Sequence, residues 1–154
     1  DVNRVETNGR TVLHLACMRD KGADIVRCIL QRCDDTLVGA TDGEGHTAIH
    51  MTFVSGCVET VQLLLQAGLD INQTNDNGET LLHLACMRPG GLQLVQWLVE
   101  HGLRPGGLQF VQWLVEHGGS DIGAVDLNGR TTLDLAKIKG HSEVATWLEG
   151  RLSL

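Results

Sequence analysis

The sequence predicts an all-α solenoid of helix-turn-helix units joined by hairpin-like fingers, and two observations support this prediction. First, the strings NGRTVLHLAC, EGHTAIHMTF, NGETLLHLAC and NGRTTLDLAK begin at residues 8, 44, 77 and 128. Their threonines, at 11, 47, 80 and 131, are 36, 33 and 51 residues apart, which indicates an underlying period of about 33 residues. Second, each string is followed by an apolar run of helical periodicity. Such units bury their apolar faces by stacking on one another.

Each unit is expected to begin with a tight turn and a short first helix. Asn-Gly pairs at residues 8–9, 77–78 and 128–129 tolerate the positive φ angles that a hairpin-like turn requires. The four threonines follow where a helix N-cap is expected, with a hydroxyl that can accept a backbone N–H of the first turn. The first helix then presents a small, apolar face, such as Leu13, Leu15 and Ala16.

A second helix is expected to return antiparallel to the first in every unit. Its apolar stripe is found in IVRCIL (25–30), VQLLLQ (61–66), LVQWLV (94–99) and VATWL (144–148). The three tryptophans, Trp97, Trp113 and Trp147, lie on such helices. We interpret them as core residues that pack against the next unit.

The repeated run Gly-x-Thr-x-Leu-His-Leu-Ala, followed by a second helix and by Gly-x-Asp-Ile-Asn at 68–72, resembles the ankyrin repeat. The resemblance covers nearly the whole chain and implies an ankyrin-repeat solenoid with β-turn or hairpin fingers. Three units keep both members of the Thr-x-x-His motif, namely Thr11 with His14, Thr47 with His50 and Thr80 with His83. The sequence departs from the family where the usual proline is replaced by Val12, Ala48, Leu81 and Thr132.

The fourth unit carries Asp134 where the family has histidine. Its carboxylate is expected to bond back toward Thr131 as in a capping box, which suits a terminal unit. One domain is expected over residues 1–154, with repeats at about 6–41, 42–74, 75–125 and 126–154. Asp1-Val2-Asn3 is similar to Asp70-Ile71-Asn72, so the chain is expected to start inside a longer array, whereas the mixed C-terminal helix is expected to end it.

The third unit contains a near-exact duplication. RPGGLQLVQWLVEHGL (88–103) is followed directly by RPGGLQFVQWLVEHGG (104–119), with fourteen identities in sixteen positions. Such identity implies either recent duplication or deliberate insertion into a natural host, and we favour insertion. Only one copy fits the repeat's own second-helix position. Connector strain and the bulkier Phe110 are expected to decide which one. The other copy either folds back over its own repeat or docks on a second molecule to form a homodimer, and we favour docking.

Composition narrows the classes of partner. The formal charge is −7, with no run of basic residues that would neutralise a phosphate backbone, so nucleic acid is not expected as a partner. No apolar stretch is long enough to span a bilayer, and we expect no membrane association. The five cysteines are odd in number and most lie in apolar helical patterns, which favours a reducing, intracellular location, cytoplasmic or nuclear.

Candidate chemical sites are few. The in-phase histidines are explained by hydrogen bonds to threonine and backbone, and the loose grouping of His46, His50 and Cys57 lacks a fourth ligand for zinc. No nucleophile elbow or phosphate loop is present, so neither enzymatic activity, a metal nor a cofactor is expected. Asn72 lies in a context that resembles the family's sites of asparagine hydroxylation.

The family resemblance implies that variable positions of the fingers and of the first-helix ends bind a protein or peptide segment. On the fingers these are Thr7, Asn8, Arg10, Glu44, His46, Asp76, Asn77, Glu79, Leu127, Asn128 and Arg130. In the groove they are Met18, Arg19, Val54, Ser55, Met87, Arg88, Ile138 and Lys139, an apolar residue followed mostly by a basic one. This pattern either covers helix ends or accepts an extended segment with apolar and acidic side chains.

Three functional hypotheses remain open. The leading one is a scaffold for protein–protein interaction, from a larger protein with an inserted helix. The second is an engineered test of helix duplication with no retained binding role, distinguished by whether the parent sequence lacks residues 104–119. The third and most remote is a metal-dependent enzyme, which metal analysis would identify.

Overall fold

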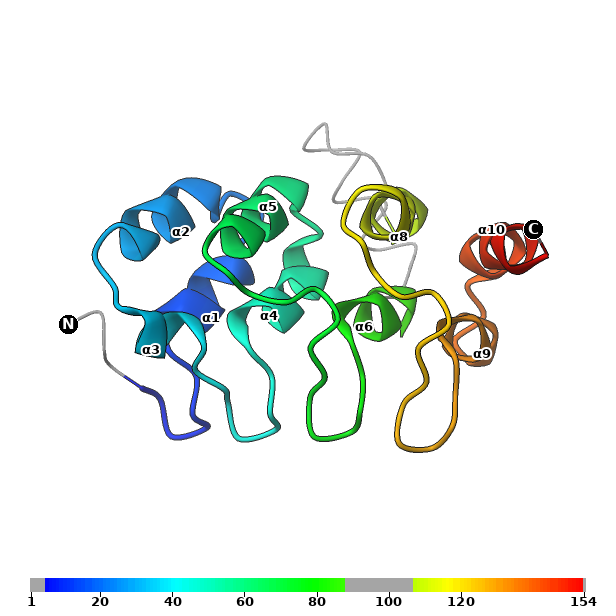
Figure 1. Ribbon diagram of the computed structural model, residues 1–154, viewed down its shortest axis with the longest axis horizontal. Coiled ribbons are helices and arrows are strands. Elements are labelled where there is room, and N and C mark those ends of the chain that lie inside the picture. The colour runs from blue at the N-terminus through cyan, green and yellow to red at the C-terminus, as the bar shows by residue number, and fades with distance from the viewer. Residues whose placement is uncertain (1–4, 88–106, 154) are drawn as a thin grey trace.

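The computed structural model describes residues 5–87 and 107–153, which fold into helix pairs that follow one another along a row (Figure 1). Each pair has a first helix next to the fingers and a second helix on the far side. The first helices are α1 (Val12–Cys17), α4 (Ala48–Ser55), α6 (Leu81–Met87) and α9 (Thr132–Ile138). The second helices are α2 (Ala23–Leu30), α5 (Val58–Gln66), α8 (Gly107–Glu116) and α10 (Ser142–Leu152). The prediction of an all-α solenoid is confirmed.

The first helices begin where the threonines were expected to cap them. Thr11, Thr47 and Thr131 are the N-cap residues of α1, α4 and α9, each in an extended backbone conformation, and each forms a capping box with the residue three positions later. In the fourth unit that residue is Asp134, whose carboxylate accepts the Thr131 backbone N–H at 2.8 Å. The predicted role of Asp134 is therefore confirmed.

The core lies between the two layers of helices. α1 packs on α4, α4 on α6 and α6 on α9, while the second helices cover this row from one side. Leu13, Ile49 and Leu82, at equivalent positions of the first three units, are completely buried. Burial of an aliphatic side chain contributes about 1.5–3 kcal/mol, so the stacked faces are the main source of stability.

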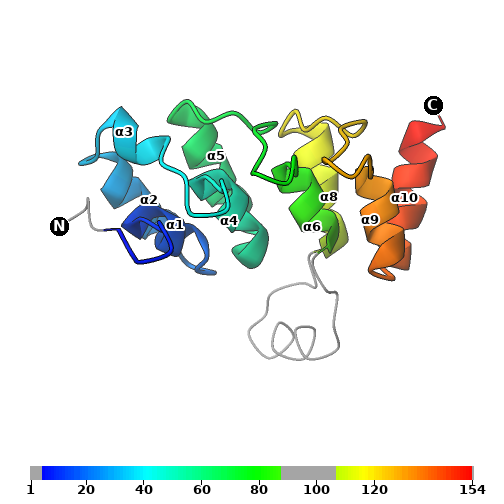
Figure 2. The same ribbon diagram turned by 90° about the horizontal axis from the view of Figure 1, so that it is seen from below.

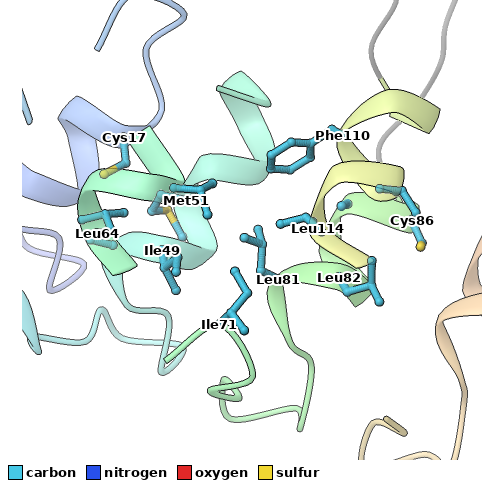
Figure 3. Packing of buried hydrophobic residues seen from close by; sticks show 14 of the residues in the cluster. Cys17, Ile49, Met51, Leu64, Ile71, Leu81, Leu82, Cys86, Phe110 and Leu114 are labelled. Atoms are coloured by element: carbon cyan, nitrogen blue, oxygen red, sulfur yellow. The ribbon is translucent and has the colours of Figure 1, made fainter. Parts of the chain in front are cut away.

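The second copy of the duplicated segment occupies the second-helix position of the third repeat. Phe110 and Leu114 of α8 point toward Met51 of α4 and Leu81 of α6 (Figure 3). Phe110 is 3% exposed and Val111 is completely buried. The first copy, residues 88–103 with Trp97, lies outside the described part of the chain.

The other two tryptophans lie at the edge of the core. Trp113 on α8 and Trp147 on α10 are only partly buried, and both pack against core residues. The Arg151 guanidinium lies 5.2 Å from the centre of the Trp147 ring, a cation–π arrangement. The interpretation of these two tryptophans as core residues is therefore confirmed only in part.

One helical turn, α3 (Asp35–Val38), was not foreseen. It falls in the first unit, where the spacing from Thr11 to Thr47 is three residues longer than the spacing from Thr47 to Thr80. The Asp34 side chain caps it by accepting the Leu37 backbone N–H at 3.1 Å, and Leu37 and Val38 are buried. The extra residues are thus folded against the core.

Candidate functional site

Four fingers extend from the first-helix layer, away from the second helices, and Figure 2 shows them from below. Within each finger, the backbone N–H of the first residue donates to the carbonyl of the fifth, as from Asp42 to His46 at 2.9 Å. The fourth residue is a glycine with φ between 72° and 83°, a conformation that strains other residues. Each finger is therefore a fixed hairpin turn.

Neighbouring fingers are joined tip to tip. The backbone N–H of Gly43 donates to the carbonyl of Asn8 at 2.8 Å, Asp76 to Glu44 at 3.1 Å and Leu127 to Asn77 at 2.9 Å. These bonds link the four fingers into one row. Side chains at their tips are consequently held at fixed intervals along the molecule.

A buried Asp or Asn side chain organises each of the last three fingers, and these residues were not predicted from the sequence. One oxygen of Asp42 accepts the backbone N–H groups of the second and fourth residues after it, both at 3.0 Å. Asn75 and Asp126 do the same in their fingers. In these three repeats an Asp or Asn stands five residues before the threonine that precedes the first helix, and this was the available signal, since such side chains favour turns.

The two carboxylates among these residues are stabilised in their charged form. Burial alone would raise the pKa of Asp42, but hydrogen bonds from the backbone of Glu44 and His46 lower it below its ordinary value. Burial alone would likewise raise the pKa of Asp126, but hydrogen bonds from Arg130 and Asn128 outweigh this effect and lower it below its ordinary value. Arg10 and Arg130 each form an ion pair with one of these carboxylates.

Two histidines of the Thr-x-x-His motif, His14 and His50, bond to backbone that follows their own helix pair. Nδ1 of His14 accepts the backbone N–H of Thr11 at 3.2 Å, so the proton of the neutral ring is on Nε2, which donates to the carbonyl of His46 at 2.9 Å. His50 repeats this arrangement with Thr47 and the carbonyl of Gln73. The expected bonds to threonine and backbone are therefore present in these two units.

Burial holds these rings neutral. The side chains of His14, His50 and His83 are completely buried. Burial is the main cause that lowers the pKa of His50 to about 4, with a smaller contribution from His46. Burial also lowers the pKa of His14 and of His83. His14 and His50 act as structural connectors, whereas Nε2 of His83 has no hydrogen-bond partner in the described part of the chain.

The predicted finger residues divide into two groups. Glu44, Asp76, Asn77 and Asn128 are exposed, and the Glu44 side chain is 73% exposed. Arg10 and Arg130 are partly exposed but are held by Asp42 and Asp126. Leu127, at the fourth fingertip, is 77% exposed, an unusual value for an apolar residue.

Two residues expected on the finger surface instead face inward. Glu79 is only 7% exposed, and its carboxylate accepts the Asn75 amide at 2.9 Å, so the prediction that the third finger displays it is wrong. The His46 side chain is 12% exposed because the ring is held between Asp42 and Asn75. Both side chains shape the fingers and offer little surface.

The residues expected at the first-helix ends are mostly accessible. Arg19 and Lys139 are exposed, and Val54 and Ile138 are 36% and 63% exposed. Met18, Met87 and Ser55 are partly buried. Arg88 lies outside the described residues.

The grouping considered for zinc does not assemble in the structure. Both ring nitrogens of His50 are used by Thr47 and Gln73, and Cys57 stands at the N-cap position of α5. Within residues 5–87 and 107–153, the potential ligands that come together are Asp42, Glu44 and His46, whose ligand atoms lie within 4.8 Å of one another. Because the Asp42 oxygen already accepts two backbone N–H groups, this cluster stabilises the finger.

Asn72 lies between the second and third units. Its Nδ2 donates to the carbonyl of Gly119 at 3.2 Å, and its Oδ1 accepts the backbone N–H of Asp121 at 2.8 Å. The residue is exposed. Its amide therefore joins two loops that are far apart in the sequence.

In the described part of the chain, no helix has the length and apolarity needed to cross a membrane.

Comparisons with known proteins identify repeats of one kind along most of the chain. Residues 13–106 match a family model for ankyrin repeats in three copies, and residues 103–149 match a second model for ankyrin repeats in many copies. The chicken (Gallus gallus) nuclear factor NF-kappa-B p105 subunit is 26% identical over 150 residues, which is 97% of this chain and 14% of that protein.

Two further relatives match about two thirds of the chain. The mouse (Mus musculus) B-cell lymphoma 3 protein homolog is 30% identical over 64% of this chain and 22% of its own length. The chicken NF-kappa-B inhibitor alpha is 30% identical over 61% of this chain and 30% of its own length. The chain thus spans less than a third of each of these relatives.

Proposed function

Because the chain belongs to the ankyrin-repeat family, we propose that it is a protein–protein interaction scaffold that binds an extended segment of a partner protein. The family and the relatives support a role in protein–protein interaction, and one relative's name describes an inhibitor of another protein. The observation that supports the position of the binding site is the row of hydrogen-bonded fingers, whose tips are exposed and chemically varied. We call the proposed site the finger and helix-end surface. It consists of Glu44, Asp76, Asn77 and Asn128 with Met18, Arg19, Val54, Met87, Ile138 and Lys139.

Preorganisation favours this surface over the second-helix layer. Buried Asp42, Asn75 and Asp126 fix the finger backbones, and tip-to-tip hydrogen bonds fix the fingers relative to one another. A surface that is already ordered loses little conformational freedom when a partner binds. Little of the binding energy at this surface is therefore offset by the cost of ordering the fingers.

The chemistry of the surface indicates the kind of segment that it binds. Arg19 and Lys139 place positive charge at the two ends of the row, next to partly buried Met18 and the 63% exposed Ile138. Glu44 and Asp76 place negative charge on the two central fingers. The complementary segment carries apolar and acidic side chains facing the helix ends, and its central part carries a basic side chain.

Binding without catalysis is the other part of the proposal. Asp42, Asn75 and Asp126, which lie among other polar side chains of the fingers, are engaged in hydrogen bonds that hold the backbone. We propose that the protein acts inside the cell without a cofactor, nucleic acid or membrane, as expected from its charge and cysteines. Exposed Asn72 is a candidate for hydroxylation, which would be detected as a mass increase of one oxygen atom on its peptide.

The duplicated helix adds a separate proposal about assembly. One copy forms α8 within the repeat, and we propose that the copy at 88–103, which lies outside the described residues, docks on a second molecule and forms a dimer. Light scattering on this chain, and on a version that lacks residues 88–103, tests this at tens of micromolar. Monomers in both cases would contradict it.

A peptide selection tests the proposed binding surface. Random twelve-residue peptides displayed on phage would be selected on the original chain. The affinity of the selected peptides would then be measured for the original chain and for the double variant Arg19→Glu, Lys139→Glu. We expect about a hundredfold loss of affinity, because the two reversed charges would repel the acidic side chains of the bound segment. The matched control is Arg32→Glu, an exposed basic residue just after α2, which should leave the affinity unchanged. Equal losses for both variants would contradict the proposed site.

A further inference from the structure

The second and third fingers are joined by a hydrogen bond between side chains as well as by the backbone bond from Asp76 to Glu44. The side-chain nitrogen of Asn75 lies 3.0 Å from Nε2 of His46. Asn75 is 6% exposed, and the His46 side chain is 12% exposed. The bond between them is therefore largely shielded from water.

Three other hydrogen bonds fix the orientation of the Asn75 amide. Its oxygen accepts the backbone N–H groups of Asn77 and Glu79, at 3.0 Å and 2.9 Å, so its nitrogen points the other way. One N–H of that nitrogen donates to the Glu79 carboxylate at 2.9 Å, and the other faces His46. Because an amide nitrogen only donates, Nε2 of His46 is the acceptor, and the ring proton is on Nδ1.

That proton joins the same ring to the second finger. Nδ1 of His46 lies 3.2 Å from Oδ1 of Asp42 and 3.5 Å from Oε2 of Glu44. The ring thus has its own finger at one nitrogen and the third finger, through Asn75, at the other. We call the hydrogen bond between His46 and Asn75 the finger bridge.

The fourth finger shows why the bridge requires an amide. Asp126 stands where the third finger has Asn75, and it makes the same two bonds to its own turn, at 2.8 Å and 2.9 Å. As a carboxylate it only accepts, and its other oxygen is bound by Arg130 of the same finger at 2.8 Å. An aspartate at position 75 would therefore keep the turn but could not donate to His46. The amide of Asn75 is needed for the bridge and not for the turn.

Two exposed carboxylates lie at the tip that the bridge holds. The backbone N–H of Asp76 donates to the carbonyl of Glu44 at 3.1 Å. A Cβ atom on Gly45 would collide with the Asp76 carboxylate, so this carboxylate lies directly against the second finger. Within residues 5–87 and 107–153, no lysine or arginine forms an ion pair with Glu44 or Asp76. Two carboxylates held at one tip attract a cationic group.

We propose that His46 and Asn75 are positioning residues of the finger and helix-end surface. Their bond holds the carboxylates of Glu44 and Asp76 at a fixed separation, and the two carboxylates together bind one lysine or arginine side chain in the middle of the bound segment. This rests on the proposed function, which supplies the segment and its basic side chain. Because the fingers are already joined, binding of the basic side chain does not have to order two loose tips.

Hydrogen exchange of the chain without any partner tests the positioning. The amide proton of Asp76 crosses between the two fingers, so its exchange rate reports how often they separate. His46→Leu removes the acceptor, and Asp76 should then exchange about fivefold faster, as expected for the loss of one hydrogen bond. His46→Gln supplies an uncharged side chain whose oxygen can accept from Asn75. In that variant Asp76 should exchange within about twofold of its original rate.

Two controls keep the exchange measurement specific. The amide proton of Leu127 crosses between the third and fourth fingers, and its rate should not change in His46→Leu. Arg130→Leu is the same replacement at the equivalent position of the fourth finger, and it should leave the exchange of Asp76 unchanged. Equal exchange of Asp76 in His46→Leu and His46→Gln would overturn the proposal.

The affinity of a selected peptide tests the role in recognition. The probes are a peptide selected on the original chain that carries a central lysine or arginine, and the same peptide with alanine at that position. His46→Leu should bind the basic peptide about tenfold more weakly, and His46→Gln at most about twofold more weakly. Both variants should bind the alanine peptide as the original chain does. Equal losses for the two peptides would overturn the proposal, because a general loss of stability weakens both.

Failure of this proposal and failure of the proposed function give different results. If the selected peptides bind at the fingers but Asp76 does not respond to His46→Leu, the positioning is wrong and the proposed function is not. If Asp76 responds as expected but the peptides bind away from the fingers, the proposed function fails. The role of His46 and Asn75 in recognition then fails with it.

Discussion

The second and fourth repeats begin with the same threonine cap but carry different residues three positions later. His50 accepts the cap's backbone N–H and donates its other ring nitrogen to the carbonyl of Gln73, which leads into the third repeat. Asp134 accepts from the Thr131 backbone and hydroxyl, and its bonds stay within its own repeat. An imidazole has two opposite nitrogens and so both caps a helix and joins repeats, whereas a carboxylate here only caps.

Exchanging these roles should have the largest effect. His50→Asp places a carboxylate at a position that is completely buried and removes the bond to Gln73. We expect the free energy of unfolding to fall by about 3–5 kcal/mol, since an unpaired buried charge is strongly destabilising. Urea denaturation measures this. A loss no larger than that of Asp134→Ala would show that His50 does not join the repeats.

The pH dependence should separate the two residues next. The pKa of His50 is lowered to about 4 by burial, so between this value and the ordinary 6.5 the unfolded chain binds a proton that the folded chain does not. Stability is therefore complete above pH 6.5 and is lost as the pH falls through that window. The contribution of His50 is on the order of 3 kcal/mol.

Asp134 should act in a more acidic range. Hydrogen bonds from Thr131 lower its pKa below 3.8, so its contribution is present above that pH and is lost below it. Urea midpoints measured from pH 8 to pH 3 test both statements. His50→Gln should flatten the profile between pH 6.5 and 4, and Asp134→Asn should leave that window unchanged. Identical profiles for the two variants would contradict the assignment.

Removing a threonine cap should have a smaller effect. Thr80 donates its hydroxyl to Nδ1 of His83 and its backbone N–H to the same nitrogen, at 2.9 Å and 3.2 Å. Thr80→Ala should destabilise the protein by about 1 kcal/mol, as loss of a helix cap does. Thr80→Ser retains the hydroxyl and serves as the control. An unfolding free energy equal to that of the original chain would mean that Thr80 does not cap α6.

The smallest change is expected at the exposed cap of the fourth repeat. Asp134 is exposed, and its neutral replacement in Asp134→Asn retains one acceptor oxygen. We expect a loss of about 0.5 kcal/mol or less at pH 7, because exposed charges contribute little. Thermal denaturation at neutral pH measures it. A loss as large as that of Thr80→Ala would show that the charge at this position is more important than the hydrogen bond.

Much of the fold was predictable because the same local sequence pattern occurs in all four repeats. Thr followed by His or Asp three residues later marks each first helix, and apolar periodicity marks the second. The inward turn of Glu79 was not predictable from spacing, because it depends on Asn75 being buried and able to donate to it. Likewise, α3 forms because Asp34 caps three added residues and Leu37 is buried.

The choice between duplicated helices was only partly predictable. Over the residues that match α8, the two copies differ at Leu94 and Phe110 alone, and the sequence identified this difference without showing what the larger ring would contact. In the structure, Phe110 is 3% exposed and points toward the α4 side of the core. The exposed or buried state of finger residues was harder still, since it depends on contacts between repeats.

The most direct test of the proposed function is a map of backbone amide shifts by nuclear magnetic resonance. A peptide selected on the chain would be titrated into the isotope-labelled protein. The scaffold account predicts that the largest shifts fall on the fingers and on the ends of α1, α4, α6 and α9, near Glu44, Asp76, Val54 and Ile138. Shifts confined to the outer helices α2, α5 and α10 would contradict the finger and helix-end surface as the binding site.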